Sequence, residues 1–388
     1  MADQADGLRA WSTKSERKLV AQMPFKQNHG SPTALTVDSQ GQPSDGTGVV
    51  VGFEDGSFAL YRLAHEESRF VYQYSHEAST NGVVSAVALS YPYAVTMTAT
   101  QRLSVYHFRE HTGGEHHIPE PPRLLHSLKS HTVWPPLSTS LRLSESSIVV
   151  SIAYTLPTYL SGWTVGVQEV HFSPEGRLLS SRLTSAIDQH YRPLAFSSPP
   201  IIHHLPAPAV TTLVTSTATE LRHIHSKPTS LSYTHPYLLV SHPDNTLTLY
   251  LVTSTTESLT ISAGSRLFGH TSSVSGAHVG GRGKAVSVSR RGDELRIWEL
   301  EGGLASSAAK RRLATGDLSV QLRPAASSAE STQAGLDLVT NANTATASHD
   351  EASELTLTRG WIGFDDENVV VLKEQSHGRQ ALVVYDFT

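Results

Sequence analysis

The stretch GHTSSVSGAHVGGRGKAVSVSRRGDELRIWEL, residues 269–300, decides the fold. It begins with a Gly-His pair, and its apolar residues predict a first strand at Val274–Val279 and a second at Lys284–Ser289. A charged tight turn then leads into a third strand that ends at Trp298 and its two successors. Short strands joined by tight turns predict a small antiparallel sheet. Because one such sheet cannot bury both of its faces, we expect copies of it to stack side by side.

Two weaker copies of this unit occur earlier in the chain. Residues 49–63 (VVVGFEDGSFALYRL) alternate as strand, Asp-Gly turn and strand, which is a strong hairpin signal. Residues 238–252 (LLVSHPDNTLTLYLV) have the same form around Asp244 and Asn245. In both copies an aspartate, Asp55 or Asp244, stands six residues before a tyrosine. The repetition predicts an all-β ring of sheets, a β-propeller.

The composition excludes several classes of protein. The chain has no cysteine, so disulfide scaffolds, thiol catalysis and cysteine-ligated zinc are excluded. A net charge of −5 gives no basic surface for nucleic acid. The N-terminus has no apolar signal-peptide core, and no apolar run approaches the roughly 18 residues that span a membrane. We therefore expect a protein of the cytoplasm, the nucleus or both, without membrane insertion.

The unit at residues 269–300 resembles the WD repeat. In such a blade, a histidine, a serine or threonine, an aspartate and the tryptophan form a chain of hydrogen bonds inside the sheet. The resemblance assigns these places to His270, Ser289, Asp293 and Trp298, and it gives Asp55 and Asp244 the aspartate place in their own blades. Asp293 stands five residues before Trp298, where the repeat usually has six. Either a local bulge restores the network, or the network is incomplete.

Seven blades are expected from the spacing of the units, at residues 33–75, 83–129, 138–185, 192–227, 228–269, 270–324 and 357–388. The last of these ends on its third strand. We therefore expect residues 18–25 (KLVAQMPF) to close the ring by pairing with the last blade, the alternative being a disordered tail. Residues 1–17 are expected to be a tail, and residues 18–388 one propeller. Residues 301–356 are expected to be a disordered insertion from which residues 319–323 supply an outer strand.

Residues 228–252 and the phrase GRGKAVSVS…GDELRIWELEG at residues 281–302 resemble the propeller part of fungal F-box/WD-repeat proteins. The resemblance implies substrate recognition for a cullin-type ubiquitin ligase, in which an F-box grips a Skp-type adaptor. Residues 1–30 contain no helical, Leu-Pro-rich F-box segment. The protein is then either a shortened relative or one that works without an F-box, and a Skp-type adaptor is expected only if an F-box lies upstream.

Catalytic signatures are missing from the sequence. It has no G-x-S-x-G elbow, no P-loop and no H-E-x-x-H motif. Its 21 histidines include close pairs, but no third ligand is placed to complete a metal site. We expect no enzyme, no cofactor and no metal, with a propeller enzyme as the least favoured alternative.

Binding of other proteins is the function that the architecture favours. The turns between second and third strands should gather on one face, and they carry the candidate partner-binding residues Arg102, Asn245, Arg290 and Arg291. Solvated turn residues are the alternative. Trp134 and Trp163 are either exposed anchors or buried between blades. We expect a monomeric interaction propeller, either a ligase substrate receptor or a general scaffold in another complex.

Overall fold

A computed structural model of the 388-residue chain provides the coordinates. The residues that it describes are 1–12, 18–25, 29–38, 46–108, 121–130, 133–144, 146–158, 162–186, 226–280, 282–289, 294–301, 306–315, 319–322, 339–340, 362–364, 368–374 and 380–386. Almost all of their regular secondary structure is β-strand. The structure is thus an all-β propeller, as the repeats predict.

Three sheets hold the N-terminal half. The N-terminal sheet consists of β1 (Ala2–Asp3), β2 (Gly7–Trp11) and β3 (Leu19–Met23). Blade 1 consists of β4 (Pro32–Val37), β5 (Thr47–Phe53), β6 (Phe58–Ala64) and β7 (Arg69–His76). Blade 2 consists of β8 (Val84–Ser90), β9 (Tyr93–Thr98), β10 (Arg102–His107) and β11 (Arg123–Lys129).

Four blades follow. Blade 3 consists of β12 (Trp134–Leu143), β13 (Ile148–Thr158), β14 (Gly162–Phe172) and β15 (Leu178–Ser185). Blade 4 consists of β16 (Ser230–Thr234), β17 (Tyr237–Ser241), β18 (Leu247–Ser254), β19 (Leu259–Ile261) and β20 (Ser265–Leu267). Blade 5 consists of β21 (Val274–Val279), β22 (Lys284–Ser289), β23 (Leu295–Glu299) and β24 (Ser319–Leu322). Blade 6 consists of β25 (Val339–Thr340), β26 (Ile362–Phe364), β27 (Asn368–Glu374) and β28 (Gln380–Asp386).

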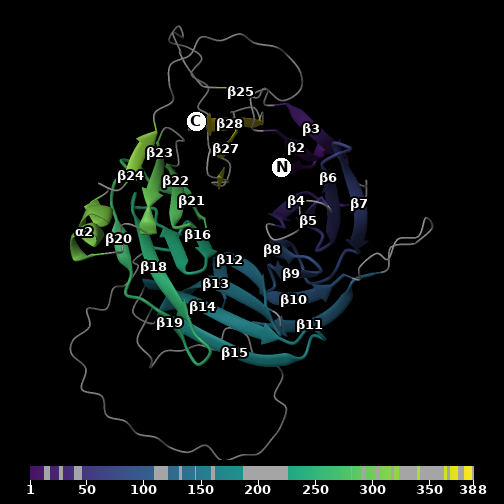
Figure 1. The fold of residues 1–388 in the computed structure, drawn as a ribbon, viewed down its shortest axis with the longest axis horizontal. Coiled ribbons are helices and arrows are strands. Elements are labelled where there is room, and N and C mark those ends of the chain that lie inside the picture. The colour runs from purple at the N-terminus through teal and green to yellow at the C-terminus, as the bar shows by residue number, and fades with distance from the viewer. Residues whose placement is uncertain are drawn as a thin grey trace, which may run out of the picture.

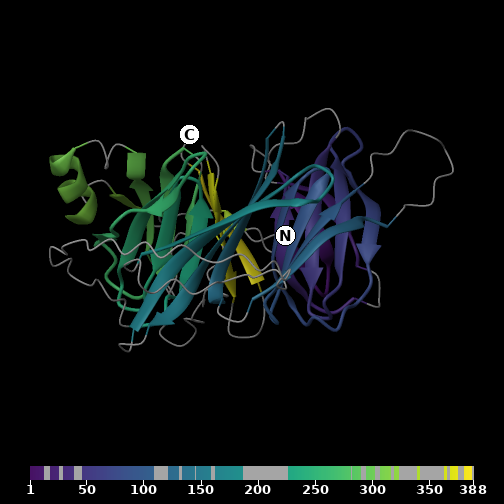
Figure 2. The ribbon, with the colours of Figure 1, turned by 90° about the horizontal axis from the view of Figure 1, so that it is seen from below.

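The blades stand around a common axis (Figure 1), and Figure 2 shows the same ring from its side. The innermost strand of each blade contacts the innermost strand of the next, in the order β4, β8, β12, β16, β21 and β26. Because all blades are oriented alike, the turns between second and third strands lie on one face of the ring. We call this face the turn face.

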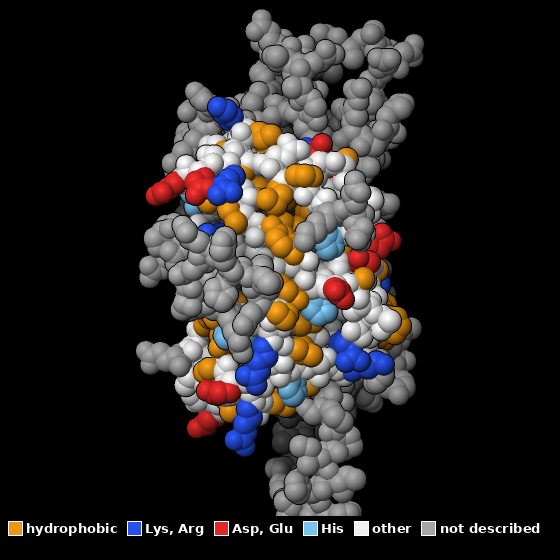
Figure 3. All heavy atoms as spheres, turned by 90° about the vertical axis from the view of Figure 1, so that its right-hand side faces the viewer, with side chains coloured by type: hydrophobic (Ala, Val, Ile, Leu, Met, Phe, Trp, Pro, Cys, Tyr) orange, Lys and Arg blue, Asp and Glu red, His pale blue; other side chains and the backbone are white. Residues whose placement is uncertain are grey.

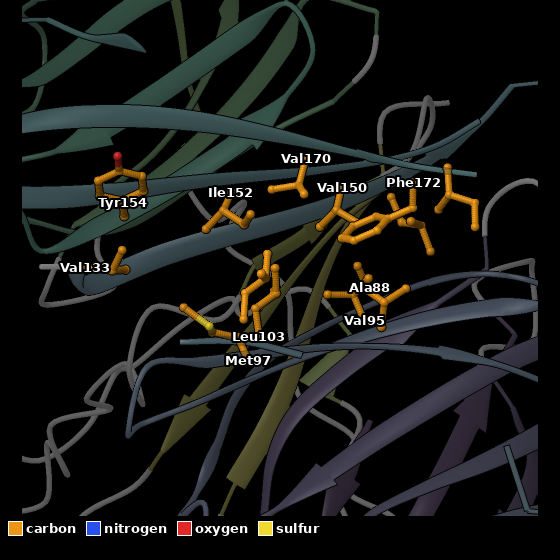
Figure 4. Packing of buried hydrophobic residues seen from close by; sticks show 14 of the residues in the cluster. Ala88, Val95, Met97, Leu103, Val133, Val150, Ile152, Tyr154, Val170 and Phe172 are labelled. Atoms are coloured by element: carbon orange, nitrogen blue, oxygen red, sulfur yellow. The ribbon is translucent and has the colours of Figure 1, made fainter. Parts of the chain in front are cut away.

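Hydrophobic side chains fill the spaces between neighbouring blades. Figure 4 shows one such layer, in which Met97 and Leu103 of blade 2 meet Ile152 and Val170 of blade 3. Similar clusters join blade 1 to blade 2, blade 3 to blade 4, blade 4 to blade 5 and blade 5 to blade 6. Stacking of the blades therefore buries both faces of central strands such as β13 and β17, which a single isolated sheet cannot do.

The number of blades differs from the expectation. Six sheets have four or more strands, so the described residues form six blades rather than seven. The difference lies at the expected fourth blade, residues 192–227, of which residues 192–225 fall outside the described part of the chain. The N-terminal sheet, with three strands, is an additional smaller sheet.

Residues 18–25 were expected to close the ring by pairing with the last blade, and this pairing is not observed. This segment does form a strand, β3, but β3 pairs with β2 and not with the last blade. Residues 2–11, expected to be part of a tail, supply β1 and β2. Leu8 and Ala21 are buried in a cluster with Phe53 of blade 1, so the N-terminal sheet packs against that blade.

The fourth strand of the last blade is β25. Val339 and Thr340 pair in parallel with Val383 and Val384 of β28. This short strand, β24 and the helix α2 (Ser307–Thr315) all lie within residues 301–356, which were expected to be a disordered insertion. Leu313 of α2 is buried in the cluster between blades 4 and 5. The expected outer strand of its blade is confirmed, because β24 pairs with β23.

The outer rim of the ring mixes apolar and charged groups. Figure 3 shows the side that faces right in Figure 1, where apolar side chains are interspersed with charged residues and histidines. Leu19 on β3 and Leu124 on β11 are among the exposed apolar residues of outer strands. Charges near strand edges, such as Arg69 at the start of β7, discourage pairing with other chains.

Candidate interaction face

In blades 1, 2 and 4, the described turn between the second and third strands is held by the loop that enters the next blade. The backbone N–H of Ser79 donates to the carbonyl of Asp55 (3.3 Å), and the N–H of Ser130 donates to the carbonyl of Gln101 (2.9 Å). In blade 4 the side-chain amide of Asn245 donates to the carbonyl of His270 (2.9 Å). Gln101 and Asn245 adopt positive φ angles of 62° and 58°. The face is therefore a set of linked turns rather than independent loops.

Asp55 organises the turn of blade 1. One of its carboxylate oxygens accepts hydrogen bonds from the backbone N–H (2.9 Å) and the hydroxyl (2.6 Å) of Ser57. His29 lies 3.0 Å from the same hydroxyl and stacks on Phe53. Desolvation acts to raise the pKa of Asp55, but the Ser57 hydrogen bonds and His29 outweigh it and lower the pKa. Asp55 thus acts within the turn and does not reach the tyrosine of its blade by any hydrogen bond in the described structure.

Asp244 has a similar role in blade 4. It accepts a hydrogen bond from the hydroxyl of Thr246 (2.6 Å) and pairs with Arg266 on β20. Desolvation opposes ionisation, yet Thr246 and Arg266 hold the pKa of Asp244 below its ordinary value. Next to it, burial lowers the pKa of His242 to about 4, and the ring of His242 lies 2.8 Å from the hydroxyl of Thr248.

Arg102 starts β10 at the edge of the turn face. It is half-buried, and its guanidinium donates to the hydroxyl of Ser127 (3.1 Å) on β11. Its partner in the strand register is Lys129, a second cation. Like charges directly opposite each other destabilise a strand pair, so Arg102 and Lys129 are an unfavourable register pair.

The polar network of blade 5 runs through Ser287. Its hydroxyl lies 2.6 Å from Nε2 of His270 and accepts a hydrogen bond from Nε1 of Trp298 (2.8 Å). All three side chains are buried. The serine expected at this place, Ser289, instead accepts a hydrogen bond from the backbone N–H of Glu294 (3.1 Å). The correction follows from the sheet register: Trp298 lies opposite Ala285, and on the same face of β22 Ser287 is two residues from Ala285, whereas Ser289 is four residues away.

Glu294 supplies the carboxylate of this network. Its Oε2 accepts hydrogen bonds from the N–H (2.8 Å) and hydroxyl (3.0 Å) of Thr271 and lies 3.4 Å from Nδ1 of His270. Arg296 donates to its other oxygen (2.9 Å). Desolvation acts to raise the pKa of Glu294, but the hydrogen bonds from Thr271 and Arg296 outweigh it, so the pKa is lowered. Asp293, Arg290 and Arg291 lie outside the described residues.

Sequence patterns did not reveal a buried ion cluster between blades 3 and 4. Glu169 on β14 is fully buried and pairs with Arg142 (2.8 Å) and Arg182 (2.9 Å). Ser254 of blade 4 donates to the same carboxylate (2.7 Å). The flanking residues VQEVHF alternate like an ordinary strand, so nothing in the sequence distinguishes Glu169 from a solvated residue.

The described residues offer little chemistry beyond these contacts. Within them, no three His, Asp or Glu side chains are grouped so that they could hold a metal ion. The histidine pairs at residues 116–117 and 203–204, and His223 with His225, lie outside the described part. No helix in the described ranges is long and apolar enough to cross a membrane.

Comparison with known proteins identifies the family. A family model described as the F-box protein pof12 β-propeller matches residues 1–388. No curated protein matches the chain. Among solved structures, BamB from Moraxella catarrhalis is similar at a TM-score of 0.44 and 10% sequence identity, over 100% of this chain and 95% of that chain. That likeness carries no functional argument. Because the family match spans the whole chain, the protein belongs to the F-box protein pof12 β-propeller family.

Proposed function

We propose that this propeller recognises substrates for an F-box-type, cullin-dependent ubiquitin ligase, or that it is a shortened relative of such a receptor. The observation that carries the proposal is the family match over residues 1–388. F-box proteins join a ligase adaptor to a target, and a propeller supplies the surface that holds the target. The linked turns of the turn face offer a rigid surface for this role, since a preordered surface loses little entropy on binding.

Within this proposal, blade 5 is a WD-type blade and the turn face is the partner-binding face. Arg102 and Asn245 lie on that face in the structure, and Arg290 and Arg291 remain candidates on sequence grounds. Arginine grips carboxylates and phosphates through two parallel hydrogen bonds, which suits an acidic or phosphorylated segment. The unfavourable Arg102–Lys129 register pair supports Arg102 most directly.

A general scaffold role is the second candidate, because the linked turns of the turn face could equally hold partners within another complex. A scaffold requires no adaptor. It holds its partners in an assembly without changing their lifetime.

Affinity purification of the endogenous protein, followed by mass spectrometry, separates the two candidates. Recovery of a Skp-type adaptor and a cullin, with bound targets that accumulate when the protein is deleted, is the result expected of a receptor. The scaffold role predicts a different result. Stable partners would be recovered without adaptor or cullin, and their abundance would not change when the protein is deleted. That result would rule out the receptor role.

A further inference from the structure

Four side chains at the top of blade 3 form a surface that we call the tryptophan ledge: Trp134, Pro157, Trp163 and Lys227. Trp134 begins β12, Pro157 lies near the end of β13, and Trp163 lies near the start of β14. These strand ends belong to the turn face, because the loop from blade 2 and the β13–β14 turn both lie there. Trp134 is 44% exposed, Pro157 and Lys227 are exposed, and Trp163 is half-buried.

The strand register places the three apolar side chains on one side of the sheet. Trp134 pairs with Thr155, directly before a register shift in β12, and Pro157 pairs with Trp163. Directly paired residues share a face, and so do residues two apart on one strand, such as Thr155 and Pro157. Val165, the other partner of Thr155, packs among residues of blade 4. The ledge therefore looks toward the junction of blades 3 and 4.

The backbone beneath Trp134 is fixed. The hydroxyl of Thr155, which is fully buried, donates to the carbonyls of Trp134 (2.9 Å) and Pro135 (3.2 Å). An exposed indole on a fixed strand loses little conformational freedom when a partner covers it. Tryptophan in such a position is typical of the anchors that dominate binding energy at interfaces.

One cation borders the ledge. The ammonium of Lys227 lies 5.5 Å from the centre of the Trp163 ring, within range of a cation–π contact. Among the described residues, no carboxylate forms an ion pair with Lys227. Glu169, on the same strand as Trp163, is buried and paired with two arginines. The charge of Lys227 is thus available to an acidic group from outside the chain.

The spacing of the two indoles suits an extended ligand. β12 and β14 are separated by one strand, and with the register offset their tryptophan backbones lie about 10–12 Å apart. A polyproline II segment places residues i and i+3 on one face, about 9 Å apart, and the broad indole rings span the difference. Aromatic side chains set in this way are the usual surface for proline-rich segments.

We infer that the tryptophan ledge binds an extended, polyproline-like segment of a partner protein, with proline or aliphatic side chains three residues apart and an acidic residue beside them. The apolar side chains cover Trp134 and Trp163, and the acidic residue pairs with Lys227. The inference rests on the proposed interaction role and adds to it the chemistry of the partner.

Selection from a displayed library of random peptides of about 12 residues, panned against the full chain, tests the inference without a known partner. We expect enrichment of peptides with proline or aliphatic residues three apart and a neighbouring Asp or Glu. Trp134→Ala should weaken the selected peptides about tenfold or more, as loss of an anchor does. Lys227→Glu should reverse their preference from acidic to basic flanks. Phe268→Ala, which removes an equally exposed aromatic from the same face, should leave binding unchanged.

Three outcomes overturn the inference. One is a selection that yields no peptides of this type, and another is a set of peptides that bind the Trp134→Ala variant as tightly as the unchanged protein. The third is a dimer in size-exclusion chromatography that Trp134→Ala abolishes, because the ledge would then hold a second copy of the chain. If endogenous partners co-purify with the protein although one of these three outcomes is observed, the interaction role stands while the ledge loses its assignment. Unchanged circular dichroism of the variants excludes misfolding as the cause.

Discussion

Trp298 donates its indole N–H to the hydroxyl of Ser287, eleven residues earlier in the chain, at 2.8 Å. The same hydroxyl contacts His270, so one serine joins the loop that enters blade 5 to the second and third strands of that blade. All three groups are buried, where an unpaired polar group is costly. The serine therefore links the start of the repeat to its end.

Replacing Ser287 with alanine should destabilise the protein by about 1–3 kcal/mol, because the indole N–H of Trp298 loses its acceptor in a buried place. Chemical denaturation measures the loss. In a double-mutant cycle, Trp298→Phe should remove the part of the Ser287→Ala effect that comes from this bond, since phenylalanine has no N–H to satisfy, and leave the part that comes from His270. Additive effects of the two substitutions would show that the bond contributes nothing.

The difference between Ser287 and Ser289 shows what a sequence pattern settles and what it leaves open. The first three strands of blade 5 were predicted to within about one residue of their observed ends, because apolar alternation and turn residues are local signals. The network was assigned to Ser289 because residues were counted along the chain. The hydrogen bonds depend instead on how the strands align with each other, and this alignment brings Ser287 to Trp298 and His270. A shift of two residues keeps the face of the strand, so Ser287 and Ser289 were indistinguishable by pattern.

Two other features depended on contacts that the patterns did not identify. The apolar residues of β3 predicted a strand, but its partner is the preceding strand β2, whose residues were expected to be part of a tail, and Leu8 and Ala21 of these strands pack with Phe53 of blade 1. Glu169 has the same local surroundings as a solvated strand residue, and only the arrival of Arg182 and Ser254 makes it a buried centre. The sequence therefore predicts strands and repeat class, while the partners of strands and charges follow from three-dimensional contacts.

Glu169→Gln should destabilise the protein by about 3–5 kcal/mol, because Arg142 and Arg182 would lose the buried carboxylate that offsets their charge. Glutamine keeps the shape of the side chain, so the loss reports charge rather than packing. The matched control is Glu67→Gln, which removes the exposed partner of Arg69 and should change stability by less than about 1 kcal/mol. Equal effects of the two substitutions in thermal or chemical unfolding would contradict this assignment.

Acidification should destabilise the fold through His242. Burial lowers its pKa from 6.5 to about 4, so between these values the folded protein keeps it neutral while the unfolded chain binds a proton. Stability therefore falls as pH falls from about 6.5 to 4, by roughly 1–3 kcal/mol from this residue. His242→Gln should flatten this part of the stability curve, as measured by denaturation at a series of pH values. Parallel curves for the two proteins would assign the loss to other groups.

Gly56→Ala should disturb the turn of Asp55. Gly56 has a φ of +81°, and an added Cβ would lie 2.8 Å from the carbonyl oxygen of Ser79 in the loop that enters blade 2. We expect a loss of about 1–3 kcal/mol from backbone strain together with the clash. Gly82→Ala has almost the same φ, +79°, but its nearest contact is a methyl group of Thr100 at 3.3 Å. The difference in unfolding free energy between the two variants therefore measures the contact between the turn and the loop. If both variants lose the same stability, backbone strain alone accounts for the loss.

Leu8→Ala tests whether the N-terminal sheet belongs to the folded propeller. Leu8 on β2 is 1% exposed and packs in the cluster that contains Phe53 and Tyr61 of blade 1. Removing its side chain should cost about 2–5 kcal/mol if the sheet unfolds together with the blade. Leu19 on β3 is 41% exposed, so Leu19→Ala should change stability by only about 0.5 kcal/mol. If residues 1–25 were only a tail, neither Leu8→Ala nor Leu19→Ala would change the stability of the propeller, and a denaturation experiment would not distinguish the two variants. A large effect of Leu8→Ala alone would show that the blades need this sheet beside them, since its side chains cover the face that blade 1 turns away from blade 2.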